Sequence, residues 1–248
     1  MYEKGLKAVP TFGVIPCTAT FGTEPYSEQP LMPTKKIEGL RSDGTLHMDH
    51  KLVIHKPISK EGKLHLEKVI SAVYDRGEGK GAKINVDIIA KDEAGDPVFT
   101  NTMGYLNRWA GGFGGPKVPH STVVIPEREA DYEIKDAYPE NAPLLYRLTG
   151  DTYPLHVDPA FAKKAGFDRP IVHGLCSLGY ACRMMIDALF PGEPERMVSI
   201  ENQFRAVALP GDHFTLHVWK TGENEALFRM VKDSDGKAIL DYGRMTWK

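Results

Sequence analysis

The feature that most constrains the fold is an apolar helical stripe followed by three alternating segments near the end of the chain. Apolar residues recur at three- and four-residue steps from Leu175 to Leu189, the spacing of a helix with one buried face. This helix is expected to begin near Gly174 and to stop before Pro191 and Gly192. Three strands are expected after it, over residues 214–218, 226–231 and 238–247. One long helix followed by an antiparallel meander indicates a sheet wrapped around a helix.

The first half of the chain shows similar strands without an equally clear long helix. Apolar residues alternate with polar ones over residues 84–88, and a second apolar segment over residues 98–105 follows a Gly-Asp-Pro turn, which predicts an antiparallel hairpin. Residues 69–74 are expected to form a neighbouring strand. The glycine-rich stretch within residues 111–130 predicts a linker, and 248 residues are enough for two small domains, residues 1–125 and 126–248.

Composition narrows the class of protein. A net charge of −2 is too balanced for the whole chain to attract nucleic acid or an anionic membrane. The sequence has no run of about 18 apolar residues, the length that would indicate a membrane-spanning helix. The first residues do not resemble a secretory signal, and the last three are not the peroxisomal Ser-Lys-Leu ending. Three cysteines without metal-type spacing favour reduced thiols, so a cytoplasmic protein is expected.

An aspartate and a histidine form the most informative pair. Asp151 and His156 stand five residues apart across a turn set by Gly150 and Pro154. Because free Asp titrates near about 3.9 and free His near about 6.5, the pair offers a carboxylate and a mostly neutral imidazole at neutral pH. Such a pair can activate water. The alternative is that Asp151 caps the turn and His156 is a packed histidine.

The start of the expected helix offers a second candidate group. The Gly174 N–H lies among the unpaired donors of a helix N-terminus, where it would polarise a thioester carbonyl, although Gly174 could also be only a helix-start residue. Cys176 could be a nucleophile activated by the same terminus, but its apolar neighbours favour a buried side chain.

Two further patterns carry weaker signals. His47, His50 and His55 are interpreted as solvent-exposed residues of a polar loop, because no cysteine or well-spaced carboxylate accompanies them, and no metal site is expected. The glycines at 111–115 lack the Lys-Ser/Thr pair and the strand-to-helix context of a phosphate loop, so a turn or linker is preferred.

Several motifs together resemble one enzyme family. Residues 150–156, 158–159, 165–167 and 170–176 are similar to the MaoC-like (R)-specific enoyl-CoA hydratases, specifically the hydratase domain of peroxisomal multifunctional enzymes. Segments of the first half and residues 209–212 match as well, so the resemblance spans most of the chain. It implies an α+β double hot-dog fold, two repeats of antiparallel sheet wrapped around a helix. Residues 1–125 would be a degenerate repeat that makes room for the acyl group, and residues 126–248 the catalytic repeat.

The resemblance also implies a reaction. Asp151 and His156 would hold the water that adds to a trans-2-enoyl-CoA, giving a (3R)-3-hydroxyacyl-CoA, while the Gly174 N–H binds the thioester oxygen. Which of the two side chains protonates C2 stays open. The enzyme would be a lyase of lipid β-oxidation and a homodimer, and it would need no metal or redox cofactor because CoA is part of the substrate. Further substrate contacts are expected from His47, Met48, Arg76, Thr152, Tyr153, Pro154, Leu155, His173 and Phe204.

One residue departs from the family pattern. Tyr153 stands where the family usually has Asn, and a phenol is longer and bulkier than an amide. Tyr153 could supply a substitute hydrogen bond, reshape the pocket or point outward. We expect retained hydratase chemistry with altered substrate choice. Two other functions stay open: a hot-dog thioesterase, in which the carboxylate directs water to the carbonyl carbon, and a non-catalytic acyl-CoA-binding protein.

Overall fold

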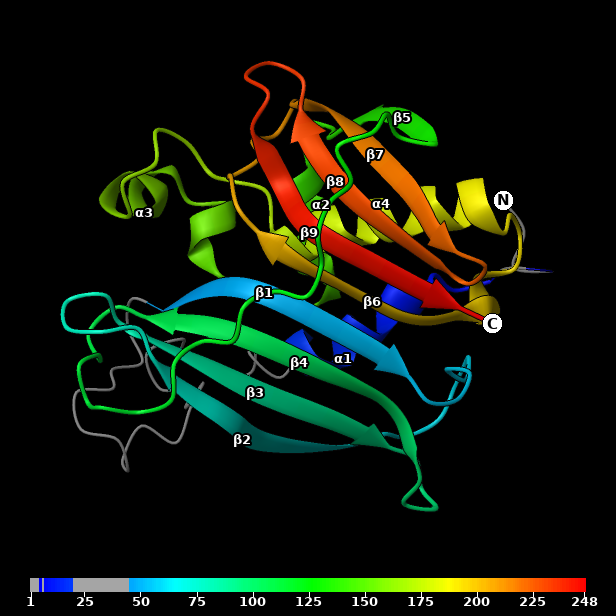
Figure 1. The fold of residues 1–248 in the computed structure, drawn as a ribbon, viewed down its shortest axis with the longest axis horizontal. Helices are drawn as coiled ribbons and strands as arrows, with labels where there is room; N and C mark the ends of the chain where they lie inside the picture. The colour runs from blue at the N-terminus through cyan, green and yellow to red at the C-terminus, as the bar shows by residue number, and fades with distance from the viewer. Residues whose placement is uncertain (1–4, 6, 20–44) are drawn as a thin grey trace.

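The computed structural model describes residues 5, 7–19 and 45–248. Within these residues nine antiparallel strands form one continuous sheet in the order β2-β3-β4-β1-β6-β9-β8-β7-β5 (Figure 1). The strands are β1 (Thr45–Ile54), β2 (His65–Asp75), β3 (Ala82–Lys91), β4 (Pro97–Asn107), β5 (Tyr132–Ala137), β6 (Met197–Phe204), β7 (His213–Gly222), β8 (Glu225–Lys232) and β9 (Ala238–Trp247). The helices are η1 (Pro10–Val14), α1 (Ile15–Ala19), α2 (Ala142–Tyr146), η3 (Arg147–Thr149), η4 (Pro154–His156), α3 (Pro159–Lys164), α4 (Gly174–Leu189) and η5 (Pro194–Arg196).

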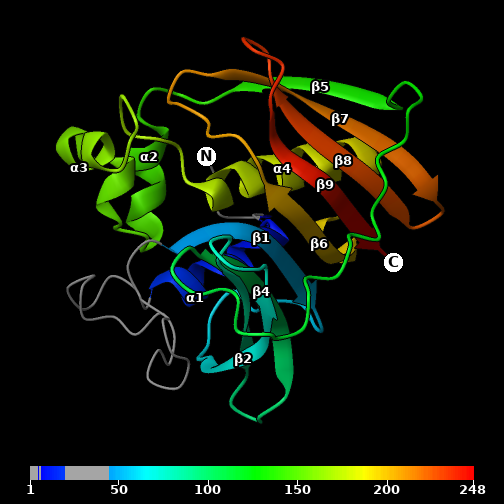
Figure 2. The same cartoon turned by 60° about the vertical axis from the view of Figure 1, so that its left-hand side comes forward.

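The second half of the sheet curves around helix α4, as Figures 1 and 2 show from two directions. The helix has the predicted bounds, and its apolar stripe is core: Leu178 and Met184 are fully buried, together with Phe214 and Phe228 of the facing strands. Strands β7, β8 and β9 match the predicted meander. The sheet wrapped around a helix is therefore confirmed for this half.

The first half is a four-stranded sheet, β1 to β4, covered by shorter helices. The predicted hairpin is β3 and β4, and the predicted neighbouring strand is β2. Among the described residues of this half, the helices η1 and α1 each have five residues. They dock on the sheet because the buried amide of Asn101 on β4 donates to the Gly13 carbonyl at 3.1 Å.

The two halves share one sheet because β1 pairs with β6, with His50 opposite Asn202. The glycine-rich connection between β4 and β5 contains bends and an isolated bridge from Lys117 to Asp75. The N–H groups of Gly112 and Gly114 donate to the Asp75 carboxylate at 2.8 and 2.7 Å. These donors hold a carboxylate of the chain itself, in a segment that joins β4 to β5, which agrees with the preferred interpretation as a turn or linker.

The interpretation of these histidines as residues of an exposed polar loop is wrong for His47 and His50, whereas His55 is exposed and lies just after a strand. These histidines lie on or directly after strand β1, and His50 is only 1% exposed. Its Nε2 bonds Asn101 Oδ1 at 2.9 Å, which allows a polar ring to be buried in the sheet. Strands β1, β5 and β6 were not predicted, because their polar residues hide the alternation that reveals a strand.

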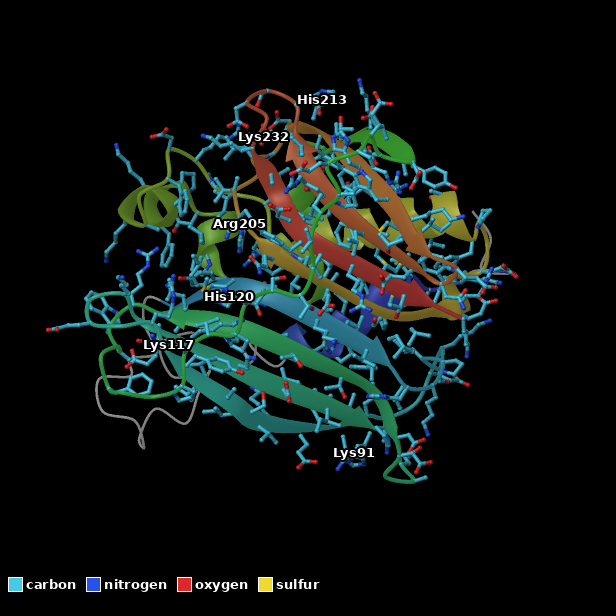
Figure 3. The ribbon with its side chains drawn as sticks, viewed as in Figure 1. Lys91, Lys117, His120, Arg205, His213 and Lys232 are labelled. Carbon is cyan, nitrogen blue, oxygen red and sulfur yellow. The ribbon has the colours of Figure 1, made fainter. Side chains whose placement is uncertain are left out.

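Two surface features bear on partners. None of the helices in the described part of the chain is long and apolar enough to cross a membrane. Figure 3 labels basic side chains on both halves of the molecule, with His213 and Lys232 close together and Lys91 away from them.

Candidate active site

The candidate site lies where the turn around residues 150–156 meets the N-terminus of α4. Gly150, with a φ of 121°, ends η3 in a backbone conformation that favours glycine and turns the chain toward Asp151. Pro154 then opens η4, which carries His156. The Asp151 carboxylate accepts a hydrogen bond from the Tyr153 N–H at 3.2 Å. Asp151 therefore caps its turn, as the alternative interpretation held, and the cap fixes its side chain.

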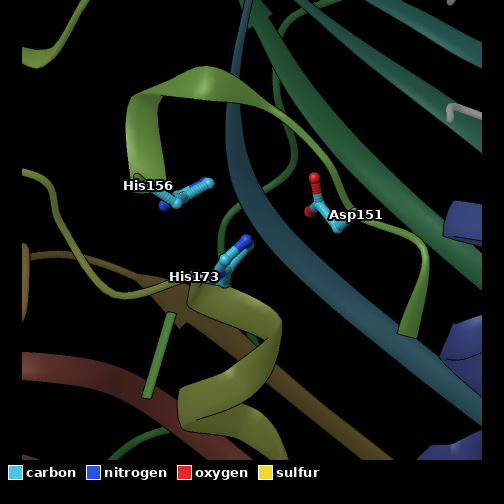
Figure 4. A group of neighbouring side chains, drawn as sticks. All are labelled: Asp151, His156 and His173. Carbon is cyan, nitrogen blue, oxygen red and sulfur yellow. The ribbon is translucent and has the colours of Figure 1, made fainter. Parts of the chain in front are cut away.

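Asp151, His156 and His173 form one cluster, shown in Figure 4. One ligand atom of each, a carboxylate oxygen or a ring nitrogen, lies within 4.8 Å of the others. A water molecule with bonds of about 2.8 Å to two acceptors would hold those acceptors about 4.5 Å apart. The spacing between the carboxylate and the imidazoles is therefore suitable for binding one water molecule.

The hydrogen bonding of His156 fixes which nitrogen faces this space. Its Nδ1 lies 2.8 Å from the Ile171 carbonyl oxygen, and because a carbonyl can only accept, Nδ1 carries the proton. Nε2 is left with a lone pair. Burial lowers the pKa of His156, and the Ile171 carbonyl and the Asp151 charge only partly oppose this effect. His156 is therefore a neutral base at pH 7.

His173 is the most enclosed member of the cluster. It is 1% exposed, and its ring stacks on the His156 ring with centroids 3.7 Å apart and 24° between the planes. Neither ring nitrogen has accessible surface or a hydrogen bond of ordinary geometry among the described residues. Burial lowers the pKa of His173 to about 2, so its ring stays neutral.

Two side chains for which no role was predicted, Tyr146 and Arg147, lie next to the cluster. The Tyr146 ring lies 4.7 Å from the His173 ring, and its buried hydroxyl has no hydrogen bond within the described residues. Burial raises the pKa of this phenol. Arg147 donates to the Thr152 carbonyl at 3.2 Å, which ties η3 to the Asp151 turn. No sequence spacing marks these residues, because their contacts cross separate segments.

Gly174 occupies the first turn of α4 and follows His173, whose side chain makes no capping hydrogen bond. The first N–H groups of a helix lack partners within the helix and favour negative charge. A Cβ at position 174 would lie 2.9 Å from the Phe204 ring, closer than real Cβ contacts. Glycine is therefore required here for close packing, and β6 brings Phe204 to the site.

Tyr153 is half-buried, and its side chain packs against helix α3. Its ring makes edge-to-face contacts with Phe161 at 5.4 Å and with His156 at 6.1 Å. Burial and the Asp151 charge raise the pKa of Tyr153. Its ring therefore packs beside Asp151 and His156, which we call the dyad, and its backbone N–H supplies the bond to Asp151. The neighbouring residues predicted to contact substrate differ in exposure: Thr152 is exposed, whereas Pro154 and Leu155 of η4 are partly buried.

The predicted contact residues of the first half are only partly brought to the site. The His47 ring lies 4.8 Å from Phe204 and stacks on Tyr105 at 5.1 Å. Met48 is the extra residue of a β-bulge in β1. Arg76 is exposed in the loop after β2, and its Nη1 donates to the Lys80 carbonyl at 3.1 Å. His47 thus lies beside Phe204, which packs against Gly174, whereas Arg76 bonds within its own loop.

The cluster does not have the geometry of a metal site. An imidazole binds a metal ion through a lone pair in the ring plane. Because the rings of His156 and His173 are stacked, an ion bound to both could not lie in both planes. Cys176 is no nucleophile either, since burial raises its pKa to about 12, which confirms the expectation of a buried thiol.

Comparison with known proteins identifies the family. The family model described as MaoC like domain matches residues 121–240, and the model described as MFE-2 hydratase 2 N-terminal domain matches residues 1–108. The probable enoyl-CoA hydratase 2 of Dictyostelium discoideum is 33% identical over 244 residues, which cover 95% of this chain and 79% of that protein.

Solved structures agree with this. A MaoC-like dehydratase from Phytophthora capsici is 29% identical, with a TM-score of 0.85 over 100% of this chain and 85% of that one. A Mycobacterium tuberculosis protein described as having a double hot-dog fold has a TM-score of 0.56 at 15% identity, over 97% of this chain and 81% of that one, a likeness of fold alone. The predicted double hot-dog fold is confirmed, and the chain belongs to the MaoC-like enoyl-CoA hydratase 2 family.

Proposed function

We propose that this protein is an (R)-specific 2-enoyl-CoA hydratase, a hydro-lyase that adds water to a trans-2-enoyl-CoA and catalyses the reverse dehydration. Family membership supports the reaction class, and a named relative is a probable enoyl-CoA hydratase 2. The observation that carries the proposal is the spacing of Asp151 and His156, whose ligand atoms lie within 4.8 Å of one another near the N-terminus of α4.

The dyad activates the water molecule. With Nδ1 held by the Ile171 carbonyl, His156 presents Nε2 as an acceptor for one water proton, and the Asp151 carboxylate accepts a hydrogen bond from the other. The water oxygen bonds to C3 of the enoyl group, and the C2–C3 π electrons move toward the thioester oxygen. The dyad then delivers one proton to C2, so the number of protons balances. No metal or redox group takes part in this step.

The helix terminus stabilises the charge that develops. As the thioester oxygen becomes enolate-like, the Gly174 N–H donates to it, and losing one such donor typically costs about 2.7–4 kcal/mol of barrier. Phe204 lies against Gly174 and leaves no room for a side chain there. In this proposal His47, Met48 and Phe204 line the acyl-CoA site, and residues 1–125 accommodate the acyl chain beside the catalytic residues 126–248.

Arg76 has a separate place in the proposal. It is exposed just after the last residue of β2, where it would pair with a CoA phosphate after releasing the Lys80 carbonyl. An Arg76→Gln variant should then raise KM for enoyl-CoA and leave KM for a phosphate-free pantetheine thioester unchanged.

Assembly and compartment are proposed more broadly. We expect a homodimer, which light scattering of the purified protein would detect. We also expect a cytoplasmic location, consistent with three buried cysteines that form no disulfide.

The deciding experiment incubates the purified protein with crotonyl-CoA and with longer trans-2-enoyl-CoAs. We expect loss of the conjugated-thioester absorbance and accumulation of 3-hydroxyacyl-CoA, shown to be the R form by chiral chromatography. Release of free CoA without the hydroxyacyl thioester would identify a thioesterase instead. Binding of the thioesters with absorbance loss at background would identify a non-catalytic binding protein.

A further inference from the structure

Three aromatic rings form a column behind the acid–base pair. Tyr146 lies against His173 with centroids 4.7 Å apart, and His173 stacks on His156 at 3.7 Å. The outer ring comes from α2, the middle ring from the residue before α4, and the inner ring from η4. Three segments that are separate in the sequence are thus packed through one middle side chain. Figure 4 shows the two imidazoles together beside the Asp151 carboxylate.

The middle ring cannot touch the substrate through its nitrogens in this arrangement. Both nitrogens of His173 lie below the surface, and neither has a hydrogen bond of ordinary geometry within the described residues. The backbone of Asp151 lies close enough to favour the protonated ring weakly. His173 therefore contacts one member of the dyad through its face and the other through the Asp151 backbone.

We propose that His173 is a positioning residue that fixes the ring plane of His156, so that Nε2 points at the space shared with Asp151. The hydrogen bond from Nδ1 to Ile171 anchors one edge of the His156 ring and leaves the ring free to tilt within the angular tolerance of that bond. A flat ring stacked against one face removes this freedom. The inference rests on the proposed hydratase reaction and assigns His173 a role in positioning the base.

The two imidazoles are not equivalent as bases. His156 has a carbonyl partner for its Nδ1–H and a carboxylate nearby, both of which stabilise the protonated ring. His173 has no strong acceptor, and a proton on His156 would further disfavour one on His173. The proton from water therefore goes to His156, and His173 stays a neutral platform throughout the reaction.

A pair of substitutions separates the ring face of His173 from its nitrogens. His173→Phe keeps a flat ring and removes the nitrogens, whereas His173→Asn keeps a polar group and removes the stack. We expect His173→Phe to keep kcat within about 3-fold of the native value. We expect His173→Asn to lower kcat about 10- to 100-fold with KM within about 2-fold, because the base is misplaced while the substrate still binds.

The pH profile of kcat/KM gives a further distinction. The acid limb should keep its position in His173→Phe and move to higher pH in His173→Asn, because the His156 ring becomes hydrated and its pKa rises toward the ordinary value. The control is His217→Asn on β7, a histidine that stacks on Trp219 at 6.1 Å outside the site, and it should change neither kcat nor the profile.

An NMR readout does not depend on activity. In protein labelled with ¹⁵N-histidine, the Nδ1–H proton of His156 should exchange slowly in the native protein and in His173→Phe, and rapidly in His173→Asn. Slow exchange in both variants would overturn the proposal. It would equally be overturned if His173→Asn kept kcat while His173→Phe lost it, or if only KM changed. Absence of hydration by the native protein would refute the proposed function, and the exchange rates would still test the positioning role.

Discussion

Within the described residues, the two halves of the molecule both bury imidazoles beside an antiparallel sheet, and in the second half one of them faces the Asp151 carboxylate. In the first half, His50 is bonded to Asn101, and the adjacent Asp49 is engaged by Lys83 at 2.7 Å. In the second half, His156 keeps Nε2 available and faces Asp151. Burial of a histidine is thus insufficient for acid–base chemistry. A ring nitrogen that can still accept a proton and a carboxylate held near it are also needed.

The largest effect is expected from a substitution that breaks the pair of Asp151 and His156. Asp151→Asn removes the negative charge and should lower kcat for enoyl-CoA hydration by about 10²–10⁴, the usual contribution of a positioned acid–base group. Asp158→Asn is the matched control, because Asp158 caps α3 and Asn caps helices equally well. Steady-state kinetics of both variants decide the point. Similar rates for the two variants would remove Asp151 from the reaction.

The next effect concerns the first-half imidazoles. Burial lowers the pKa of His50 to about 4 from an ordinary 6.5, so the unfolded chain binds the proton first as pH falls. Stability from this group is complete above about pH 6.5 and is lost progressively toward pH 4. By pH 4.5 the loss for one such group should be about 2–3 kcal/mol.

The measurement is urea unfolding at pH 7 and at pH 4.5. His50→Gln retains an amide donor for Asn101 and cannot titrate, so its stability should fall by about 2–3 kcal/mol less than that of the native protein over this range. His47 is a second contributor, because burial lowers its pKa to about 3. An identical pH dependence in the native protein and the variant would show that His50 is already protonated or solvated in the fold.

A smaller effect distinguishes two glycines of the same helix. Gly174→Ala places a methyl group 2.9 Å from the Phe204 ring, and overpacking of this kind costs about 1–3 kcal/mol. It should also lower kcat, since Phe204 or the helix terminus must move. Gly179→Ala meets no heavy atom of the described residues within 4 Å and should stabilise the helix by about 0.5–1 kcal/mol. Thermal unfolding should show a lower Tm for Gly174→Ala and a higher Tm for Gly179→Ala. Steady-state kinetics should show a lower kcat for Gly174→Ala.

The smallest effect concerns Tyr153. Its ring packs on Phe161 and its backbone N–H holds Asp151, so Tyr153→Asn keeps the backbone bond and opens space beside the dyad. We expect the ratio of kcat/KM for long over short enoyl-CoAs to change by about 10-fold, the scale of one methylene contact. An unchanged ratio across the series would mean that Tyr153 does not select the acyl group.

The elements predicted correctly are those whose side chains repeat with a regular period. Helix α4 and strands β7 to β9 keep their apolar residues on one face, so pattern alone located them. Strand β1 was missed because its buried positions include His50, whose burial depends on Asn101 of a strand more than forty positions away. Such a partner is set by strand register and leaves no local signal.

Asp151, His156 and Gly174 were marked by sequence motif, but their proximity was not. The stack of His173 on His156, the carbonyl of Ile171 that selects the tautomer and the buried phenol of Tyr146 all join segments that the sequence leaves apart. The sequence by itself determined the family, the long helix and the residues proposed as the acid–base groups, because these depend on local order and residue type. Tertiary packing decided which nitrogen is free and which ring is only a support, because both depend on atoms brought together by the fold.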